Sequence, residues 1–130
     1  MMPERTRHAH YNINYHLVFC PKFRRPVLAG DVGNRLAELI PVEVERLGGK
    51  VLEWVVMPDH VPLFASFPPT IAISQIMHQI KGAPAHQLRV EFPHLKSRLP
   101  SLWTHSYYVG TAGYVSAETI KRYIDDQKGR

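Results

Sequence analysis

Hydrophobic side chains follow two kinds of pattern along the chain, and the first kind predicts strands. Segments rich in aromatic and branched residues, bounded by turn residues, are typical of strands in a small sheet. Four segments fit this description: residues 12–20, 50–57, 60–67 and 102–109. Only Pro58-Asp59 separates the second from the third, which predicts a hairpin between them.

The second kind of pattern repeats apolar residues every three or four positions, as on one face of a helix. It predicts three helices, over residues 32–47, 70–90 and 116–128. Asp31 is placed to be the N-cap of the first helix, because its side chain can accept a hydrogen bond from a free backbone N–H. Proline lacks a backbone N–H, so we expect a kink or break at Pro41 and a division of the second helix at Gly82 and Pro84.

The order of the predicted elements indicates the fold. A βαββαβ order with a hairpin in the middle is typical of one antiparallel sheet that is covered by helices on one face. We therefore expect an α+β protein with a ferredoxin-like or RRM-like layout, extended by a C-terminal helix that carries Tyr123. The polar and basic residues 1–10 predict a flexible N-terminal arm, and residues 11–130 predict a single domain.

Composition narrows the class of protein without identifying it. The 130 residues carry 16 Lys and Arg against 11 Asp and Glu, a formal charge of +5, so nucleic acid is a candidate partner. Cys20 is the only cysteine, which excludes an intrachain disulfide and favours a reducing compartment. No apolar signal segment or membrane-spanning run is found. These features predict a soluble cytoplasmic protein with no membrane partner.

His60 follows the predicted turn, at a point where a metal site could form. Residues two apart on a strand point to the same face, so a His-x-His pair would direct two imidazoles at one ion. Here Pro62 occupies the second position and only His60 remains. A single histidine after a turn is more commonly a surface or hydrogen-bonded residue than a ligand. Both interpretations of His60 stay open at this point.

Tyr123 and Gln127 lie four residues apart on the predicted last helix and therefore share one of its faces. The carbonyl oxygen of Gln127 could bind a hard metal ion, and the phenol of Tyr123 could act beside it as a covalent nucleophile. The alternative is an amphipathic terminal helix in which Tyr123 is simply half-buried.

Five segments occur in an order that carries more information than any of them alone. They are Tyr15 to Val27, Val56 to Val61, Lys81-Gly82, Leu102 to Val109 and Tyr123 to Gln127. In this order they resemble the motifs of the IS200/IS605-family transposases, the single-tyrosine HUH transposases that include REP-associated relatives. The second segment leads toward the family's His-hydrophobic-His motif, and the last resembles its Tyr-Ile-x-x-Gln. The resemblance spans essentially the whole predicted domain.

The resemblance implies a DNA transposase that binds single-stranded DNA carrying a hairpin at a transposon end. Carried over to this chain, Tyr123 is the nucleophile that forms a 5′-phosphotyrosine, and His60 and Gln127 bind a divalent ion, Mg²⁺ or Mn²⁺. No nucleotide cofactor is implied, because the covalent link conserves the energy of the phosphodiester bond. The family is dimeric, so a homodimer with composite active sites is also implied, in which the tyrosine helix of one subunit completes the site of the other.

Pro62 stands where the family has its second histidine. It removes one imidazole and one backbone N–H, which predicts weaker metal binding and argues against a regular central-strand position for this residue. Asp59 or His16 could substitute as ligands. The same departure supports a second hypothesis, a catalytically impaired relative that only binds DNA hairpins.

Basic residues in the matching segments are candidate contacts to DNA phosphates. They are Lys22, Arg24, Arg25, Lys81 and Arg89. Tyr107 and Tyr108 could stack on bases, whereas core packing is the simpler interpretation of Trp103. Fold order and charge also allow a third hypothesis, an RRM-like RNA-binding module, although the strand aromatics lack a clear RNP pattern.

Overall fold

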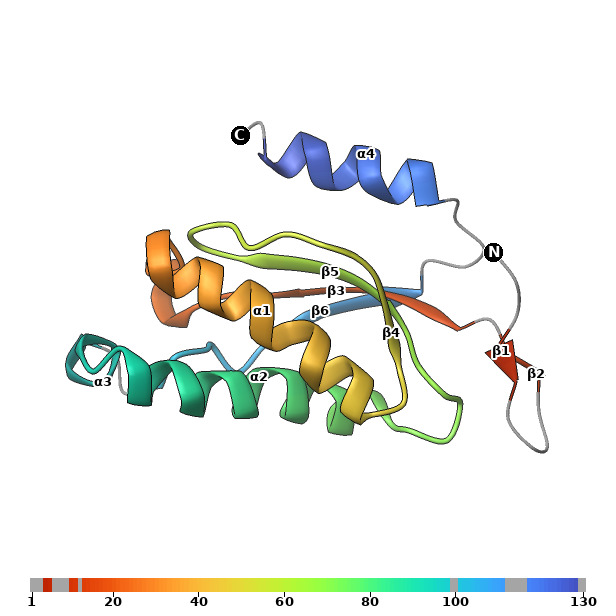
Figure 1. Ribbon diagram of the computed structural model, residues 1–130, viewed down its shortest axis with the longest axis horizontal. Coiled ribbons are helices and arrows are strands. Elements are labelled where there is room, and N and C mark those ends of the chain that lie inside the picture. The colour runs from red at the N-terminus through yellow and green to blue at the C-terminus, as the bar shows by residue number, and fades with distance from the viewer. Residues whose placement is uncertain (1–3, 6–9, 12, 99–100, 112–116, 129–130) are drawn as a thin grey trace.

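A four-stranded antiparallel sheet lies at the centre of the protein (Figure 1). Its strands follow the spatial order β4-β5-β3-β6, with the bounds β3 Asn14–Phe19, β4 Lys50–Trp54, β5 Val61–Ser66 and β6 Tyr108–Thr111. The computed structural model describes residues 4–5, 10–11, 13–98, 101–111 and 117–128. Near the N-terminus, β1 (Glu4–Arg5) pairs with β2 (His10–Tyr11) in a two-stranded ribbon. The division into an arm and a domain at residue 10 stays a prediction.

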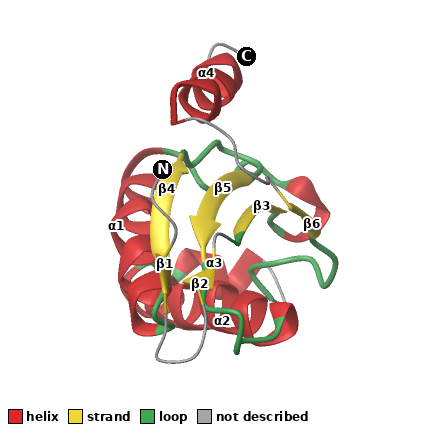
Figure 2. Cartoon of the chain, turned by 90° about the vertical axis from the view of Figure 1, so that its right-hand side faces the viewer, coloured by secondary structure: helices red, strands yellow, loops and turns green. Residues whose placement is uncertain are grey.

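Helices cover the two faces of the sheet unequally. Their bounds are η1 Lys22–Arg24, a short 3-10 helix, α1 Gly30–Arg46, α2 Ile73–Glu91, α3 His94–Arg98 and α4 Ala117–Lys128. α1 and α2 pack together under one face, whereas α4 lies across the opposite face (Figure 1, Figure 2). This arrangement confirms the predicted α+β fold, with helices on one face and an additional C-terminal helix.

The face of the sheet under α1 and α2, here called the core face, is built from alternate strand residues. Residues two apart on a strand share a face, so β3 and β5 present Leu17, Phe19, Leu63 and Ala65 toward the helices. All four are fully buried, as is Leu36 of α1. Complete burial of a leucine or phenylalanine contributes about 1.5–3 kcal/mol, so the core face carries the main hydrophobic core of the described chain.

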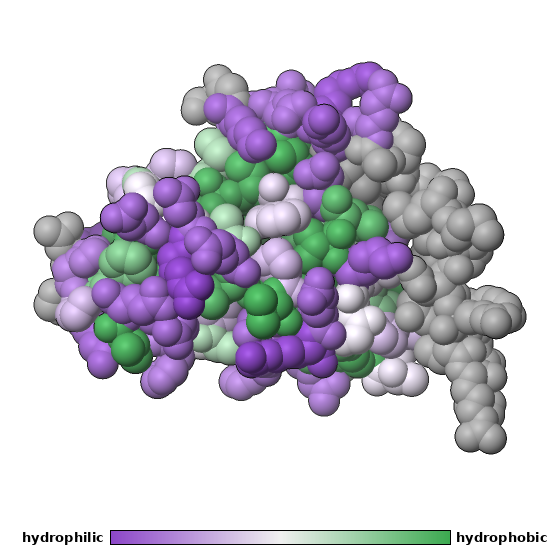
Figure 3. Space-filling view, viewed as in Figure 1, coloured by the Kyte–Doolittle hydropathy of each residue, from purple (hydrophilic) through white to green (hydrophobic). Residues whose placement is uncertain are grey.

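The opposite side of the sheet, here called the α4 face, carries a much smaller apolar cluster. Phe64 of β5 and Ile124 of α4 are buried there, and Leu52, Val55 and Tyr123 are half-buried around them. The outer side of α4 is hydrophilic, and apolar surface lies between this helix and the body of the protein (Figure 3). Docking of α4 therefore depends on few apolar contacts.

Pro62 lies inside β5, a central strand, so the prediction that it would not occupy such a position is wrong. On one side Pro62 pairs with Val18 of β3. On the other side its carbonyl accepts a hydrogen bond of 3.3 Å from the N–H of Val55, just beyond the end of β4 at Trp54. The N–H and C=O of a strand residue point to the same neighbouring strand, so an N–H at position 62 would point toward β4. The hydrogen-bonded ladder between β4 and β5 has already ended at this position.

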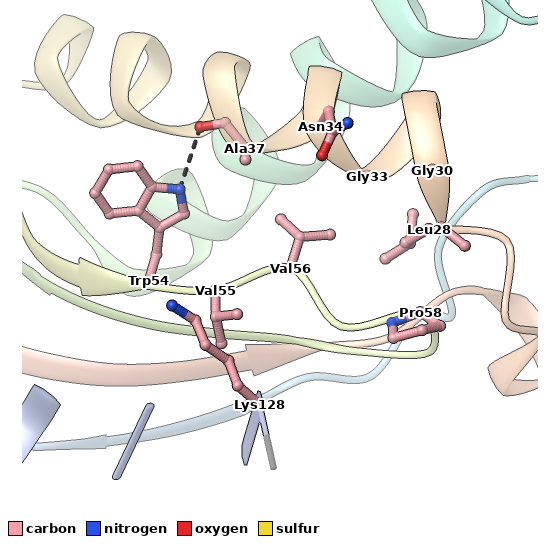
Figure 4. A pocket seen from close by; sticks show the side chains of 11 residues that line it. Leu28, Gly30, Gly33, Asn34, Ala37, Trp54, Val55, Val56, Pro58 and Lys128 are labelled. Atoms are coloured by element: carbon pink, nitrogen blue, oxygen red, sulfur yellow. Dashed lines mark hydrogen bonds between the residues drawn. The ribbon is translucent and has the colours of Figure 1, made fainter. Parts of the chain in front are cut away.

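Both long helices continue through their prolines. The predicted division at Gly82 and Pro84 is therefore wrong, and of the kink or break predicted at Pro41 the break does not occur. A proline in a helix leaves the carbonyl four residues earlier without its N–H partner, which for Pro41 is the carbonyl of Ala37. The indole N–H of Trp54 donates to this carbonyl at 3.1 Å (Figure 4). A side chain from β4 therefore supplies the hydrogen bond that the helix lacks.

Smaller differences concern where elements begin. α1 starts at Gly30, so Asp31 lies in its first turn and is not its N-cap. Of the strand predicted over residues 102–109, only the end lies in β6, and Trp103 forms an isolated bridge with Pro21. α3 lies between the helix predicted over residues 70–90 and the strand predicted over residues 102–109, and it matches neither. Ser116, the expected start of the last helix, lies outside the described residues. Among the residues described, no helix is both long and apolar enough to cross a membrane.

Candidate active site

His60 and Gln127 come into direct contact although they are 67 positions apart in the chain. His60 stands at the turn that leads into β5, where it forms an isolated bridge with Met57. Gln127 projects from the last turn of α4, and its Oε1 atom lies 3.1 Å from Nε2 of His60. Tyr123, one turn earlier on α4, is half-buried against the same face of the sheet. The fold thus assembles the three residues that the sequence singles out.

An acidic and a basic residue orient His60. Its Nδ1 lies 2.8 Å from Oδ1 of Asp59, and the other oxygen of Asp59 forms an ion pair of 3.1 Å with Arg24. The hydrogen bond with His60, together with the charge of Arg24, holds the pKa of the Asp59 carboxyl below its usual value although partial burial opposes this. An ionised Asp59 accepts a hydrogen bond from the Nδ1–H group, which leaves Nε2 as the atom available to a ligand.

The contact between His60 and Gln127 fits part of a metal site. With the proton on Nδ1, the lone pair of Nε2 faces the lone pairs of Oε1, and two acceptors form no hydrogen bond. A cation bound to both atoms, a second proton on the ring or a reversed Gln127 amide resolves this conflict. Two neighbouring ligands of an octahedral ion, each about 2.1 Å from it, are roughly 3.0 Å apart. The observed separation of 3.1 Å matches this ligand spacing and equally matches a hydrogen bond between the ring and the amide.

The ligands that the sequence suggests in place of a second histidine have other contacts. Within the described part of the chain, no group of three His, Cys, Asp or Glu side chains is arranged to hold a metal ion. Asp59 contacts the Nδ1 side of His60, away from Gln127, and His16 packs among aromatic rings. Neither of the substitutes that the sequence suggests for the histidine lost at Pro62 is placed as a third ligand.

Tyr123 is positioned by two rings that rise from the sheet. Its ring centroid lies 5.0 Å from that of His16 and 5.4 Å from that of Phe64, and both contacts are edge-on. His16 is itself stacked on Phe64, with centroids 4.4 Å apart. Aromatic contacts of this kind contribute about 0.5–1.5 kcal/mol each beyond area burial and depend on ring orientation. The candidate nucleophile is therefore held in a defined orientation, one helical turn from Gln127.

His16 completes this aromatic cluster rather than the metal pair. Its ring also meets Tyr108 of β6 edge-on at 5.5 Å. Its Nε2 atom is buried and has no hydrogen-bond partner among the described residues. Burial lowers the pKa of the imidazole, which favours the neutral ring. The sequence suggests His16 only as a substitute ligand, and the aromatic packing was not visible because it joins three strands and α4.

The residues predicted to contact phosphates fall into two groups, and the first lies beside the active-site turn. Lys22 and Arg24 belong to η1, and Arg25 follows it directly. Arg24 forms the ion pair with Asp59, so its charge is already directed at the turn that holds His60. Sequence reasoning identified Arg24 as a cation but not its partner, which lies 35 positions away.

The second group lines a groove of about 550 Å³ between α2 and the segment before β6. Lys81 is half-buried there, donates to the carbonyl of Thr104 at 2.8 Å and lies 5.5 Å from the ring centroid of Tyr107. Burial lowers the pKa of Lys81. Arg89 lines the same groove. Trp103 is 7% exposed and donates to the Lys81 carbonyl, so its predicted core packing is confirmed.

Sequence comparison relates this site to proteins of one kind. The family model described as "Transposase IS200 like" matches residues 9–127. The ISDra2 transposase TnpA of Deinococcus radiodurans is 36% identical over 119 residues, which cover 90% of this chain and 85% of that protein. The transposase for insertion sequence element IS200 of Salmonella typhimurium is 30% identical over 122 residues, which cover 92% of this chain and 80% of that protein.

Solved structures repeat the fold described above. A crystal structure described as a transposase of Deinococcus radiodurans R1 aligns with a TM-score of 0.78 at 31% identity, over 95% of this chain and 97% of that chain. A REP-associated tyrosine transposase bound to a REP hairpin aligns with a TM-score of 0.61 at 18% identity, over 95% of this chain and 69% of that chain. At that identity the second likeness concerns the fold alone.

Proposed function

This chain belongs to the family of IS200-like transposases, and from this premise we propose that it cuts and rejoins single-stranded DNA through Tyr123. The observation that carries the proposal is the contact of 3.1 Å between His60 and Gln127, with Tyr123 one turn away on α4. A nucleophile and two atoms suited to a cation share one face of the sheet. This arrangement matches phosphoryl transfer, in which positioning and charge neutralisation provide most of the catalysis.

The proposed reaction conserves the number of phosphodiester bonds. The phenolic oxygen of Tyr123 loses its proton and attacks the phosphorus, the bond to the 3′ oxygen breaks, and that oxygen leaves as a 3′-OH after taking up a proton. The 5′-phosphate stays on Tyr123 until the 3′-OH of another strand attacks it in the reverse sense. A phenol with a pKa near 10 is a poor nucleophile at neutral pH, so the step needs electrostatic help.

We propose that a divalent ion, Mg²⁺ or Mn²⁺, is bound by Nε2 of His60 and Oε1 of Gln127. Such an ion, when bound, polarises the scissile phosphate and neutralises its developing charge. Asp59 keeps the proton of His60 on Nδ1, so the nitrogen that faces Gln127 stays available. Pro62 adds no donor atom, so the ion is held by fewer protein ligands and binds more weakly than at a site with two histidines.

The proposed substrate is a single strand that carries a hairpin, as the REP-associated relative is bound to a REP hairpin. We also propose a homodimer with composite sites. In the structure α4 docks on the sheet of its own chain, and a second copy presents an identical α4 face. Because few apolar contacts hold α4, exchange of this helix between two copies requires little rearrangement of either core.

Formation of a covalent adduct tests the proposal. The protein is incubated with single-stranded hairpin DNA and Mn²⁺, and a DNA–protein species that survives denaturation is expected on a gel. Tyr123→Phe keeps the ring in its aromatic cluster but removes the nucleophile, so the species should disappear while DNA binding remains. Absence of an adduct with the unmodified chain, under all metal conditions, would refute catalytic competence.

Pro62 favours a second candidate function, an impaired relative that binds DNA hairpins without cutting them. This alternative predicts that Pro62→His creates or greatly raises nicking and leaves hairpin affinity unchanged. Equal nicking by both forms would reject it. Family membership removes the reason for the RNA-binding hypothesis, which depended only on the order of elements and on charge.

A further inference from the structure

Phe23 is the most exposed of the large hydrophobic side chains in the described chain, with 70% of its surface accessible. It lies in η1, between the strand β3 and helix α1. The backbone at Phe23 has a φ of 61° and that at Arg24 a φ of 50°, in the left-handed region that non-glycine residues seldom adopt. The backbone conformation at Phe23 is thus unfavourable for a residue with a side chain, although this residue carries a large exposed ring.

One hydrogen bond within η1 and one to a neighbouring segment hold this conformation in place. The N–H of Lys22 donates to the carbonyl of Leu102 at 2.8 Å, and the N–H of Arg24 donates to that of Pro21 at 2.8 Å. Strained backbone that neighbouring structure enforces is common where a ligand is bound. Because the loop is already fixed, Phe23 needs no ordering before it contacts a partner.

Positive charge surrounds the ring. Nζ of Lys22 lies 5.7 Å from the centroid of Phe23, and the guanidinium of Arg25 lies 5.8 Å from it. A surface for an apolar protein partner would surround Phe23 with further apolar side chains. A ring with cations beside it instead matches the alternation of bases and phosphates in an unpaired strand.

The loop also adjoins the candidate active site. Arg24, the residue after Phe23, forms the ion pair with Asp59 that orients His60. The N–H of Leu28 donates to the carbonyl of Pro58 at 3.0 Å and ties the end of the loop to the same turn. The exposed ring therefore belongs to a loop that is joined at two points to the turn of His60.

We propose that Phe23 stacks on an unpaired nucleobase of the DNA strand that flanks the cleaved phosphate, while Lys22 and Arg25 bind phosphates on either side of that base. Arg24 stays on Asp59 and couples the position of the loop to that of His60. This inference rests on the proposed function, because it takes single-stranded DNA as the ligand. It adds a binding position for one base, next to the reacting phosphate.

An abasic scan locates that base. Affinity is measured without divalent metal, so that no cleavage occurs, for hairpin oligonucleotides in which each base near the cleavage position is removed in turn. For the unmodified protein, one abasic position should lower affinity roughly tenfold, as expected from the loss of one base–aromatic stack. Phe23→Ala should lower the affinity for intact DNA by a similar factor and abolish the effect of that abasic position.

Matched variants separate stacking from other roles of the loop. Phe23→Trp should bind with about the affinity of the unmodified protein, because it keeps a π face. The fluorescence of its indole should fall when the base stacks on it. Phe23→Leu should behave as Phe23→Ala, because leucine is apolar but presents no π face. Val90→Ala, at an exposed apolar residue on α2, should bind as the unmodified protein does. The stacking proposal fails if Phe23→Leu binds as tightly as the unmodified protein. It also fails if Phe23→Ala loses the same factor of affinity on intact DNA and on DNA that lacks the critical base.

The outcomes for stacking and for catalysis can be told apart. If Tyr123 forms adducts but Phe23→Ala binds intact DNA as tightly as the unmodified chain, the stacking proposal fails and the proposed function stands. If the unmodified chain forms no adduct, but removal of one base still lowers affinity only when Phe23 is present, the base-binding site stands and covalent catalysis fails.

Discussion

The two faces of the sheet are built from the same strands but are held together in different ways. On the core face, fully buried residues such as Leu17 and Leu63 pack against two long helices. On the α4 face, the buried hydrophobic contacts reduce mainly to Phe64 and Ile124, while the other contacts involve His60, Gln127 and aromatic rings. One face therefore determines whether the chain folds, and the other determines whether the candidate active site is assembled.

Stability and activity can therefore be disrupted separately in this protein. A helix that docks through few contacts can detach while the rest of the protein stays folded. The residues suited to bind a cation come from both sides of that contact, His60 from the sheet and Gln127 from α4. Loss of α4 docking then separates them without unfolding the core.

The largest expected effect is on the core face, at Leu63. This side chain is fully buried in β5, so Leu63→Ala removes its apolar contacts and leaves a cavity. We expect the free energy of unfolding to fall by about 2–5 kcal/mol, measured by urea denaturation. Loss of adduct formation should follow only where the protein is unfolded. A change below about 1 kcal/mol would mean that the core face is not the main source of stability.

The second prediction concerns Ile124, the buried residue of α4. Ile124→Ala should lower the unfolding free energy by less than about 2 kcal/mol, because detachment of α4 limits the penalty to the docking energy of this helix. Adduct formation should nevertheless fall strongly, since Gln127 and Tyr123 leave the sheet together. Faster hydrogen exchange in α4, with unchanged exchange in β3 and β5, would be the direct sign. Exchange that rises equally everywhere would contradict separate docking.

A third, smaller effect is expected at Trp54, whose indole donates to the carbonyl that Pro41 leaves without a partner. Trp54→Phe should lower the unfolding free energy by about 1–2 kcal/mol, because that carbonyl stays unsatisfied beside β4. Pro41→Ala supplies a helical N–H to the carbonyl of Ala37. In that background Trp54→Phe should therefore lower the unfolding free energy by a smaller amount. Equal losses in the two backgrounds would show that the indole matters only for packing.

Much of the core face could be predicted from the sequence, since alternation in strands and helical periodicity are local signals. The continuity of α1 could not, because it depends on Trp54, which lies 17 positions from the carbonyl it contacts. Pro62 is tolerated in β5 for a similar reason, namely that β4 ends before reaching it. In each case the effect of a proline was decided by a neighbouring element that the local sequence does not specify.

The α4 face was predictable only in part. The spacing of Tyr123 and Gln127 placed both on one side of a helix, and the family resemblance suggested His60 as their partner. Two other contacts join separate elements and leave no periodic pattern in the sequence. They are the pairing of Asp59 with Arg24 and the packing of His16 against Tyr123. Polar and aromatic contacts between elements depend on individual side-chain positions, whereas hydrophobic layers require only the right period.

The smallest expected effect concerns pH and belongs to the α4 face, at His16. Burial lowers the pKa of His16 below its ordinary value of 6.5, so the unfolded chain takes up a proton more readily than the folded one. Well above pH 6.5 both states are neutral at this ring and stability is unaffected. As the pH falls from 6.5 toward the lowered pKa, the folded state loses stability relative to the unfolded state.

His16→Phe keeps a ring on Phe64 and removes this titration, so the unfolding free energies of the two proteins should differ by a constant amount above pH 6.5. Below pH 6.5 the unfolding free energy of the variant should rise relative to that of the unmodified chain. The rise should be well under about 1 kcal/mol, because the ring is only half-buried. Urea unfolding of both proteins at pH 7.5 and 5.5 measures the difference, and the other histidines cancel from it. Parallel pH profiles would show that His16 titrates as it does in water, which would mean that the aromatic cluster around Tyr123 is open to solvent.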